Sequence, residues 1–133
     1  MQKVFYPVVF HPEEVGYSVS VPDIDGCFTQ GDDMNEAVSM VQEAMGLMLE
    51  DYFDSDQPFP APSAPDSIHL EQGEFVAMVE FDELEYRKQR ERQAVKKTLS
   101  IPGWLNNLAE KAGINFSQVL QEALKQRLGV TDR

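Results

Sequence analysis

The side chains best suited to chemistry in this sequence are carboxylates in its first half. Asp23 and Asp25 stand two residues apart in a turn after the second predicted strand, and Glu43 and Asp51 follow on the next predicted helix. Carboxylates that converge from a sheet and a neighbouring helix can hold two divalent cations and cleave a phosphodiester. A two-metal nuclease is therefore the best enzymatic hypothesis. We favour its alternative, an ordinary acidic surface, because the two aspartates occupy a turn.

The other reactive side chains form no recognisable catalytic or metal-binding pattern. His11 and His69 lie in a turn and at a loop end, without the serine or cysteine spacing of a catalytic triad. No Cys/His cluster has zinc spacing, and no glycine-rich phosphate loop is present. Cys27 is expected to be a small buried residue rather than a nucleophile. The sequence thus predicts a non-enzymatic protein with no metal and no other cofactor.

The charge of the chain is divided between its two halves. Residues 1–86 carry 19 acidic side chains and one basic side chain, whereas residues 87–133 carry ten basic and four acidic ones. The net charge is therefore −18 in the first half and +6 in the second, within the overall −12. An acidic first half repels nucleic acid and attracts a basic protein, and a basic second half can contact phosphates. The alternative is that acidity only keeps a small domain soluble.

Composition also restricts where the protein works. The single cysteine excludes an intrachain disulfide, and the sequence has no signal-peptide pattern, so we expect a reducing cytoplasm. No apolar run approaches the roughly 20 residues that span a bilayer, and no membrane partner is expected.

Apolar periodicity predicts a β-β-β-α-β order in the first half. Strands are expected over 4–10, 16–21, 27–30 and 75–81. Pro7 cannot donate to a ladder, so an edge or a bulge is expected there. Asp33 is the expected N-cap of the helix, with Glu36 completing a capping box. The apolar face of this helix, expected to cover the sheet, consists of Met34, Ala37, Val38, Val41, Ala44, Met45, Met48 and Tyr52.

The second half is predicted to contain a short strand and two helices. A proline-rich stiff connector over 54–66 and a charged, solvated helix precede them. The strand covers 95–100, and the first helix begins at Pro102 and stops at Gly113. The second helix is capped by Asn115, with Gln118 completing a capping box, and ends at Gly129. A segment of 39 residues can hardly bury a core alone, and its one strand has no partner. Both needs are met if two chains pair their strands as an antiparallel ribbon over four helices.

This C-terminal module resembles the ribbon-helix-helix repressors. The resemblance rests on the stretch from Lys96 to Pro102, followed by Leu105, Leu108, Ala109, Gly113, Asn115 and Ser117. In that family a two-stranded ribbon enters the DNA major groove. Strand alternation leaves Lys96, Thr98 and Ser100 facing outward for base contacts, while Lys97 has inward parity in spite of its charge. The backbone at Asn115, Phe116 and Ser117 is expected to contact a phosphate, and plain helix capping is the alternative.

The first half resembles the HicB family of antitoxins. The resemblance lies in the block from Val21 to Asp33 and in the Glu-Ala pairs at 36–37 and 43–44, and it covers about residues 3–55. Asp25 replaces the usual proline before Gly26, which changes the stiffness of that turn. The resemblance implies a degenerate ribonuclease-H-like sheet without catalytic carboxylates. It also implies a partner, a small basic HicA-type toxin that cleaves RNA.

Together the two resemblances predict an α+β protein in three parts. These are an acidic toxin-binding domain over 1–82, a charged linker helix over 83–94 and a ribbon-helix-helix (strand-helix-helix) dimerisation and DNA-binding domain over 95–133. The homodimer, or a higher oligomer, would bind the operator DNA of its own operon, and bound toxin would modulate repression. Asp23 and Asp25 are the expected toxin contacts because their turn should be exposed. The alternative is a stand-alone ribbon-helix-helix regulator whose N-terminal domain senses a small molecule.

Overall fold

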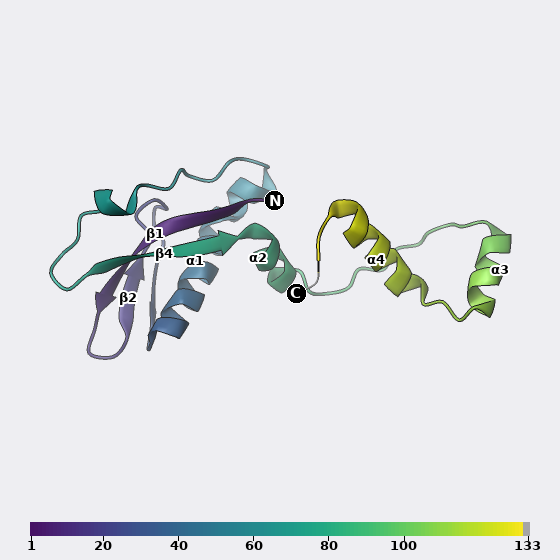
Figure 1. Ribbon diagram of the computed structural model, residues 1–133, viewed down its shortest axis with the longest axis horizontal. Helices are drawn as coiled ribbons and strands as arrows, with labels where there is room; N and C mark the ends of the chain where they lie inside the picture. The colour runs from purple at the N-terminus through teal and green to yellow at the C-terminus, as the bar shows by residue number, and fades with distance from the viewer. Residues whose placement is uncertain (132–133) are drawn as a thin grey trace. The chain divides into compact units, whose positions relative to one another are not determined.

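The computed structural model describes residues 1–131 and divides into two compact units. Unit 1 is Met1–Gln93 and unit 2 is Ala94–Arg133. The last two residues of the expected 95–133 module, 132 and 133, lie outside the described residues. The described residues form a mixed α+β structure with one four-stranded sheet and four α-helices (Figure 1).

Unit 1 is built around an antiparallel sheet with the strand order β3-β2-β1-β4. The strands are β1 (Lys3–Pro12), β2 (Tyr17–Ser20), β3 (Phe28–Gly31) and β4 (Phe75–Asp82). All four strands predicted for the first half of the chain are confirmed, each within two residues at either end. The predicted β-β-β-α-β order is confirmed as well, because the long helix α1 stands between β3 and β4.

Helix α1 (Met34–Asp54) covers one face of the sheet. The Asp33 carboxylate accepts a hydrogen bond from the Glu36 N–H at 2.8 Å, so the predicted N-cap is confirmed. The Glu36 carboxylate accepts from the N–H of Asp32, one residue earlier than a capping box requires. The core lies between this helix and the sheet, and its largest fully buried side chains are Tyr6, Phe10, Phe81, Met45 and Leu49.

The buried face of α1 differs from the predicted one at its C-terminal end. Ala37, Val41 and Met45 are buried as expected. Met48, however, is 45% exposed, and the buried positions continue instead through Leu49 and Phe53. The buried side chains thus recur every fourth residue, whereas the prediction had included neighbouring apolar positions that face outward.

Pro7 lies within an inner strand and causes no bulge. The register between β1 and β4 runs unbroken from Lys3 to Phe10. The Glu83 N–H donates to the Gln2 carbonyl, so Gln2 and Glu83 form a hydrogen-bonded pair of the ladder. Hydrogen-bonded and non-hydrogen-bonded pairs alternate along an antiparallel ladder, and the N–H and C=O groups of the odd-numbered β1 residues therefore point away from β4. On that side β2 pairs only with Val9 to Pro12. At Pro7 the strand is therefore locally an edge, as expected, and the missing N–H leaves no ladder bond unmade.

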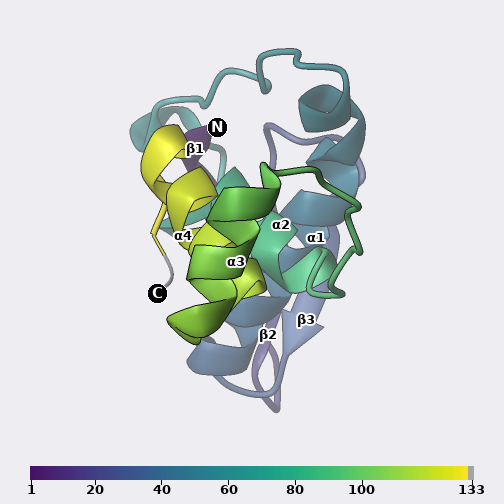
Figure 2. The same ribbon diagram turned by 90° about the vertical axis from the view of Figure 1, so that its right-hand side faces the viewer.

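The segment between α1 and β4 is fastened to unit 1. It crosses from the end of α1 to the short 3-10 turn η1 (Pro65–Ser67) in Figure 2. The Tyr6 hydroxyl donates to the Pro60 carbonyl at 2.6 Å, and the Gln2 side-chain amide donates to the Gln57 carbonyl at 2.9 Å. The Phe59 ring packs on Phe81 at 5.8 Å between centroids. The proline-rich connector is therefore held along its length by the folded domain.

Helix α2 (Glu83–Arg90) is shorter than the linker helix expected over 83–94. Asp82 caps it by accepting from the N–H groups of Leu84 and Glu85. It is not a solvated linker, because it packs against α1 and belongs to unit 1. The Tyr86 ring lies so close to Gly46 of α1 that a Cβ at Gly46 would stand 2.0 Å from a ring carbon. Glycine is therefore required at this crossing.

Unit 2 contains helices α3 (Gly103–Lys111) and α4 (Phe116–Leu128). Asn115 caps α4 by accepting from the Gln118 N–H at 3.1 Å, and the Gln118 side chain bonds Glu122 instead of closing a capping box. Gly113 and Gly129 take left-handed conformations at the helix ends, as predicted. Both helices are thus confirmed within a few residues.

The strand expected over 95–100 is not formed in the single chain. A strand requires a hydrogen-bonded neighbour, and none of the described residues pairs with this segment. Unit 2 also lacks a core of its own. No residue between 94 and 131 is buried, and α3 and α4 make few contacts with each other.

Candidate functional site

The turn that carries Asp23 and Asp25 is compact and internally hydrogen-bonded. The Val21 N–H donates to the Cys27 carbonyl at 3.1 Å, and the Cys27 N–H donates to the Ile24 carbonyl at 3.2 Å. Asp25 is exposed beside Gly26, whose φ of +77° is readily adopted only by glycine. Glycine rather than proline thus makes the left-handed bend, which explains why the turn keeps its form with Asp25 at the preceding position.

Asp23 is engaged with the proline-rich segment. Its carboxylate accepts from the Ser63 N–H at 2.9 Å and from the Ser63 hydroxyl at 2.5 Å. Burial, with a smaller contribution from the negative charge of Asp23, raises the pKa of the Tyr6 hydroxyl to about 12. Tyr6 therefore stays protonated and donates to Pro60. Asp23 thus positions two segments of unit 1, a role that the sequence pattern could not reveal.

The four carboxylates of the nuclease hypothesis are not brought together. Among residues 1–131, no group of three or more His, Cys, Asp or Glu side chains is arranged to hold a metal ion. Asp23 bonds Ser63, while Asp25, Glu43 and Asp51 are exposed. Cys27 is 1% exposed, and burial raises the pKa of its thiol to about 11. The prediction that Cys27 is a small buried residue is confirmed.

The two histidines also lie apart from any nucleophile pattern. His11 Nδ1 lies 3.1 Å from a carboxylate oxygen of Glu74, where β1 and β4 meet at the end of the sheet. His69 is exposed in the segment before β4. His11 therefore contributes to the edge of the sheet rather than to a catalytic arrangement.

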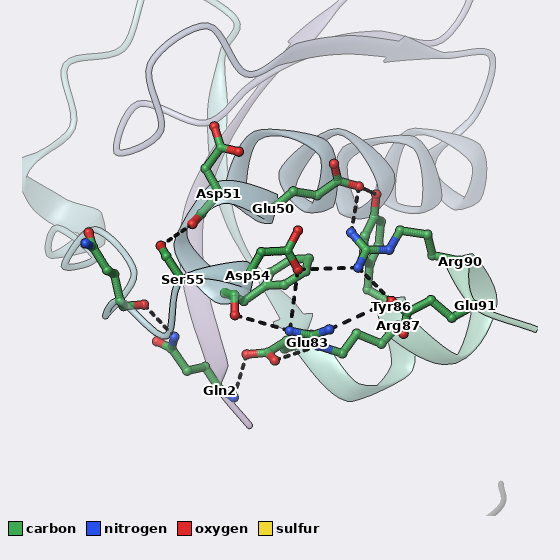
Figure 3. A network of polar contacts seen from close by, with 12 residues as sticks. Gln2, Glu50, Asp51, Asp54, Ser55, Glu83, Tyr86, Arg87, Arg90 and Glu91 are labelled. Carbon is green, nitrogen blue, oxygen red and sulfur yellow. Dashed lines mark hydrogen bonds and ion pairs between the residues drawn. The ribbon is translucent and has the colours of Figure 1, made fainter. Parts of the chain in front are cut away.

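The most extensive polar arrangement joins α1 to α2 (Figure 3). Glu83 is 5% exposed, and its carboxylate accepts from Arg87 Nε at 2.9 Å and from the Gln2 N–H at 3.2 Å. The Arg87 guanidinium lies 4.6 Å from the centre of the Phe53 ring and donates to the Phe53 carbonyl at 3.2 Å. Arg90 pairs with Glu50 at 3.0 Å. Sequence periodicity did not predict this contact, because charged side chains make it.

A surface hollow of about 610 Å³ lies between α1, the end of β4 and α2. Charged and amide side chains form most of its wall, among them Glu43, Glu85 and Arg90. Small-molecule sites are mainly apolar with a few polar groups. This hollow therefore does not have the character expected of a ligand-sensing pocket.

In unit 2 the expected DNA-contacting side chains are accessible. Lys96, Thr98 and Ser100 are exposed, and so is Lys97. At the start of α4, the Asn115 side chain occupies the Gln118 N–H, while Phe116 and Ser117 form the first helical positions and are exposed. In the single chain, residues 96–100 belong to no strand.

None of the helices formed by residues 1–131 is both long enough and apolar enough to cross a membrane. Several of the known proteins that this chain resembles are named as antitoxins. A family model described as the HicB-like antitoxin of bacterial toxin–antitoxin systems matches residues 6–124.

The chain resembles two antitoxins from Photorhabdus laumondii subsp. laumondii. It is 45% identical to Antitoxin HicB 1 over 68 residues, which are 49% of this chain and 44% of the relative, and 36% identical to Antitoxin HicB 2 over 66 residues, which are 50% and 48%. The match thus spans about half the length of these relatives.

A solved toxin–antitoxin complex from Streptococcus pneumoniae contains a chain with the same fold. The TM-score is 0.59 at 30% identity, and the match covers 95% of this chain and 99% of that one. The named relatives are antitoxins, not enzymes, in agreement with the expectation of a non-enzymatic protein. With a family model matched along most of its length, the chain belongs to the family of HicB-like antitoxins of bacterial toxin–antitoxin systems.

Proposed function

We propose that this chain neutralises a small basic HicA-type RNA-cleaving toxin with its acidic N-terminal domain and, as a dimer, represses its own operon. The observation that carries the proposal is the contrast between the two units. Unit 1 has a complete core and is acidic, with 20 acidic and five basic side chains. Unit 2 is basic and has no buried residue between 94 and 131.

The apolar side chains of unit 2 support the proposed dimerisation. Leu99, Leu108, Leu124 and Trp104 are each more than half exposed in the single chain. Burying such side chains is worth about 1.5–3 kcal/mol each, so a surface of this kind favours association. A second copy offers the same surface and also an antiparallel partner for residues 95–100. Pairing two chains would therefore supply both the missing core and the missing strand neighbour.

The paired strands would form the DNA-reading ribbon. In an antiparallel ribbon, Lys96, Thr98 and Ser100 fall on the face opposite Leu99 and Ile101. Their ammonium and hydroxyl groups suit hydrogen bonds to base edges in the major groove. The first N–H groups of α4, at Phe116 and Ser117 beside the Asn115 cap, suit a phosphate. The positive charge of unit 2 favours the same partner.

Toxin binding is assigned to the acidic unit, over residues 1–82. A net charge of −18 over residues 1–86 attracts a basic protein and repels the DNA that unit 2 would contact. Of the two expected contacts, Asp25 is exposed and remains the proposed one. Asp23, whose carboxylate is bonded to Ser63, would act by positioning the turn.

Co-expression tests the antitoxin function. The full chain is co-expressed with the protein encoded by the adjacent small gene, and the purified material is analysed for mass and composition. We expect a stable complex with a small basic protein that is toxic when expressed alone. A lone homodimer that still binds its own promoter contradicts toxin neutralisation and leaves a regulator without a toxin.

Substitution of Lys96 tests DNA reading. Lys96→Ala should weaken operator binding by about 1–3 kcal/mol if the side chain reads a base, with toxin neutralisation unchanged. Lys111→Ala, which removes one exposed positive charge from α3, is the matched control. Binding should also weaken steeply as salt rises, because phosphate contacts release counterions. Loss of neutralisation without loss of DNA binding, or a flat salt response, would exclude this assignment.

A further inference from the structure

The sheet of unit 1 has two faces of different character. α1, α2 and the proline-rich segment all pack on the face that carries Phe81, which contacts Tyr86 of α2 at 5.7 Å and Phe59 at 5.8 Å between ring centroids. Strand alternation places the odd-numbered residues of β1 on the opposite face. Val9 is among them, and although it is only 7% exposed it lies outside the core cluster formed with α1. We call this second surface the open face.

The strand register shows that the open face has an apolar centre. One row crosses all four strands, because Phe28 pairs with Ser20, Ser20 with Val9, and Val9 with Val76. In the next rows Pro7 pairs with Met78 and Phe5 with Glu80. Phe28 is 73% exposed, Phe5 52% and Met78 44%, while Pro7 and Val9 between them are buried.

Polar pairs close this apolar centre at both ends of the sheet. At one end Lys3 lies 3.6 Å from its cross-strand partner Asp82. At the other, the row from Gln30 through Ser18 leads to His11, which contacts Glu74 at 3.1 Å. An apolar centre enclosed by a polar rim is the usual organisation of a protein–protein interface.

We propose that the open face is the surface on which a small basic protein docks, with Phe28, Phe5 and Met78 as its apolar anchors. The occupant is indicated by charge, since unit 1 carries 20 acidic and five basic side chains. Lys3, the basic residue of the open face, is already paired with Asp82. Two copies of unit 1 placed face to face would bring together two domains of the same strong negative charge, which opposes association. The inference rests on the proposed function and gives the toxin a specific docking surface.

The probe is the small basic protein encoded beside the gene for this chain, and its binding to the full chain is measured as a dissociation constant. The variant Phe28→Thr/Met78→Thr keeps side chains that suit a strand and removes two anchors. We expect binding to weaken by about 30-fold or more, as for truncated interface hot spots. Leu47→Gln is the matched control, because Leu47 is 59% exposed but lies on α1. The dissociation constant of this variant for the basic protein should equal that of the wild type.

A second pair of variants tests the charge of the occupant at one position. Met78→Lys and Met78→Glu place opposite charges at the same exposed site, so that their effects on the strand itself are similar. A basic partner should bind Met78→Lys at least several-fold more weakly than Met78→Glu. The oligomeric mass of each variant in solution, measured without the partner, should correspond to the same number of chains as in the wild type. Circular dichroism should show that each variant is folded.

The possible results separate the two proposals. If the wild-type chain does not bind the adjacent-gene protein, the proposed function fails and the inference fails with it. If the wild type binds and the double variant binds equally well, or Leu47→Gln binds more weakly than the double variant, only the open face is excluded as the docking surface. If the double variant, measured without the partner, contains fewer chains per assembly than the wild type, a second copy covers the open face. This result too would overturn the inference.

Discussion

Removing the Arg87 side chain should destabilise unit 1 far more than a typical surface substitution. The Glu83 carboxylate is buried and accepts from Arg87 Nε at 2.9 Å. Arg87→Ala leaves this charge with the Gln2 N–H as its remaining partner in Figure 3. It also removes the guanidinium from the Phe53 ring and from the Phe53 carbonyl. An uncompensated buried charge is costly because it has lost both water and its partner.

The size of this effect can be estimated from the contacts. Breaking a buried ion pair on one side costs about 3–5 kcal/mol. The Gln2 N–H remains in place and the Arg87 side chain is 21% exposed, so the lower end applies, about 3 kcal/mol. For a unit of this size, that loss lowers the melting temperature by roughly 15 °C. The double variant Glu83→Gln/Arg87→Met removes both charges together and should cost less, about 1–2 kcal/mol.

The two units can be followed separately in one experiment on the full chain. All four tyrosines lie in unit 1, and the single tryptophan, Trp104, lies in unit 2. Near-ultraviolet circular dichroism of the tyrosines should show the shift on heating or in urea, and Trp104 fluorescence should not. A loss below about 1 kcal/mol, a double variant no more stable than Arg87→Ala, or an equal shift of the Trp104 transition would refute the reasoning.

The remaining predictions concern packing, capping and proton binding. Gly46→Ala should lower unit 1 stability by about 2 kcal/mol in urea unfolding, since the new methyl group overlaps the Tyr86 ring; an unchanged midpoint would contradict this contact. Asn115→Ala should cost about 1 kcal/mol in the Trp104 transition, because α4 loses its N-cap. Unit 1 should lose about 2 kcal/mol between pH 10 and pH 12, since the native chain keeps a Tyr6 proton that the unfolded chain releases, and Tyr6→Phe should flatten this decline. At pH 8, iodoacetamide should modify Cys27 about 100-fold more slowly in the native than in the unfolded chain, because the raised thiol pKa reduces the thiolate fraction.

The elements that local patterns determine could be predicted from the sequence. Apolar, β-rich runs and the alternation over 16–21 located the four strands of unit 1. The cap at Asp33 and the left-handed glycines at 113 and 129 located helix ends. The error at Met48 arose because apolar residues stand on both sides of α1 at its C-terminal end, where composition alone cannot separate the buried row from its neighbours.

Contacts between distant segments could not be predicted in this way. Nothing near Asp23 in the sequence indicates that Ser63 will bond its carboxylate. The charged sequence of α2 favoured a solvated helix, yet Arg87 and Tyr86 pack it onto α1 through stacking and ion pairs. A strand at 95–100 needs a hydrogen-bonded neighbour, and the single chain does not supply one. The apolar pattern of these residues therefore predicts a strand that the single chain does not form.

Pro7 has a consequence for the unfolded chain. The residue is less than 2% exposed, so the fold encloses this part of β1 although no strand of the described residues pairs with it on the β2 side. The missing N–H faces that side, and the proline costs the folded sheet no hydrogen bond. A proline ring also limits the backbone conformations of the unfolded chain, so less conformational entropy is lost on folding. Pro7 therefore favours the folded domain mainly through the state that it restricts, not through a contact that it makes.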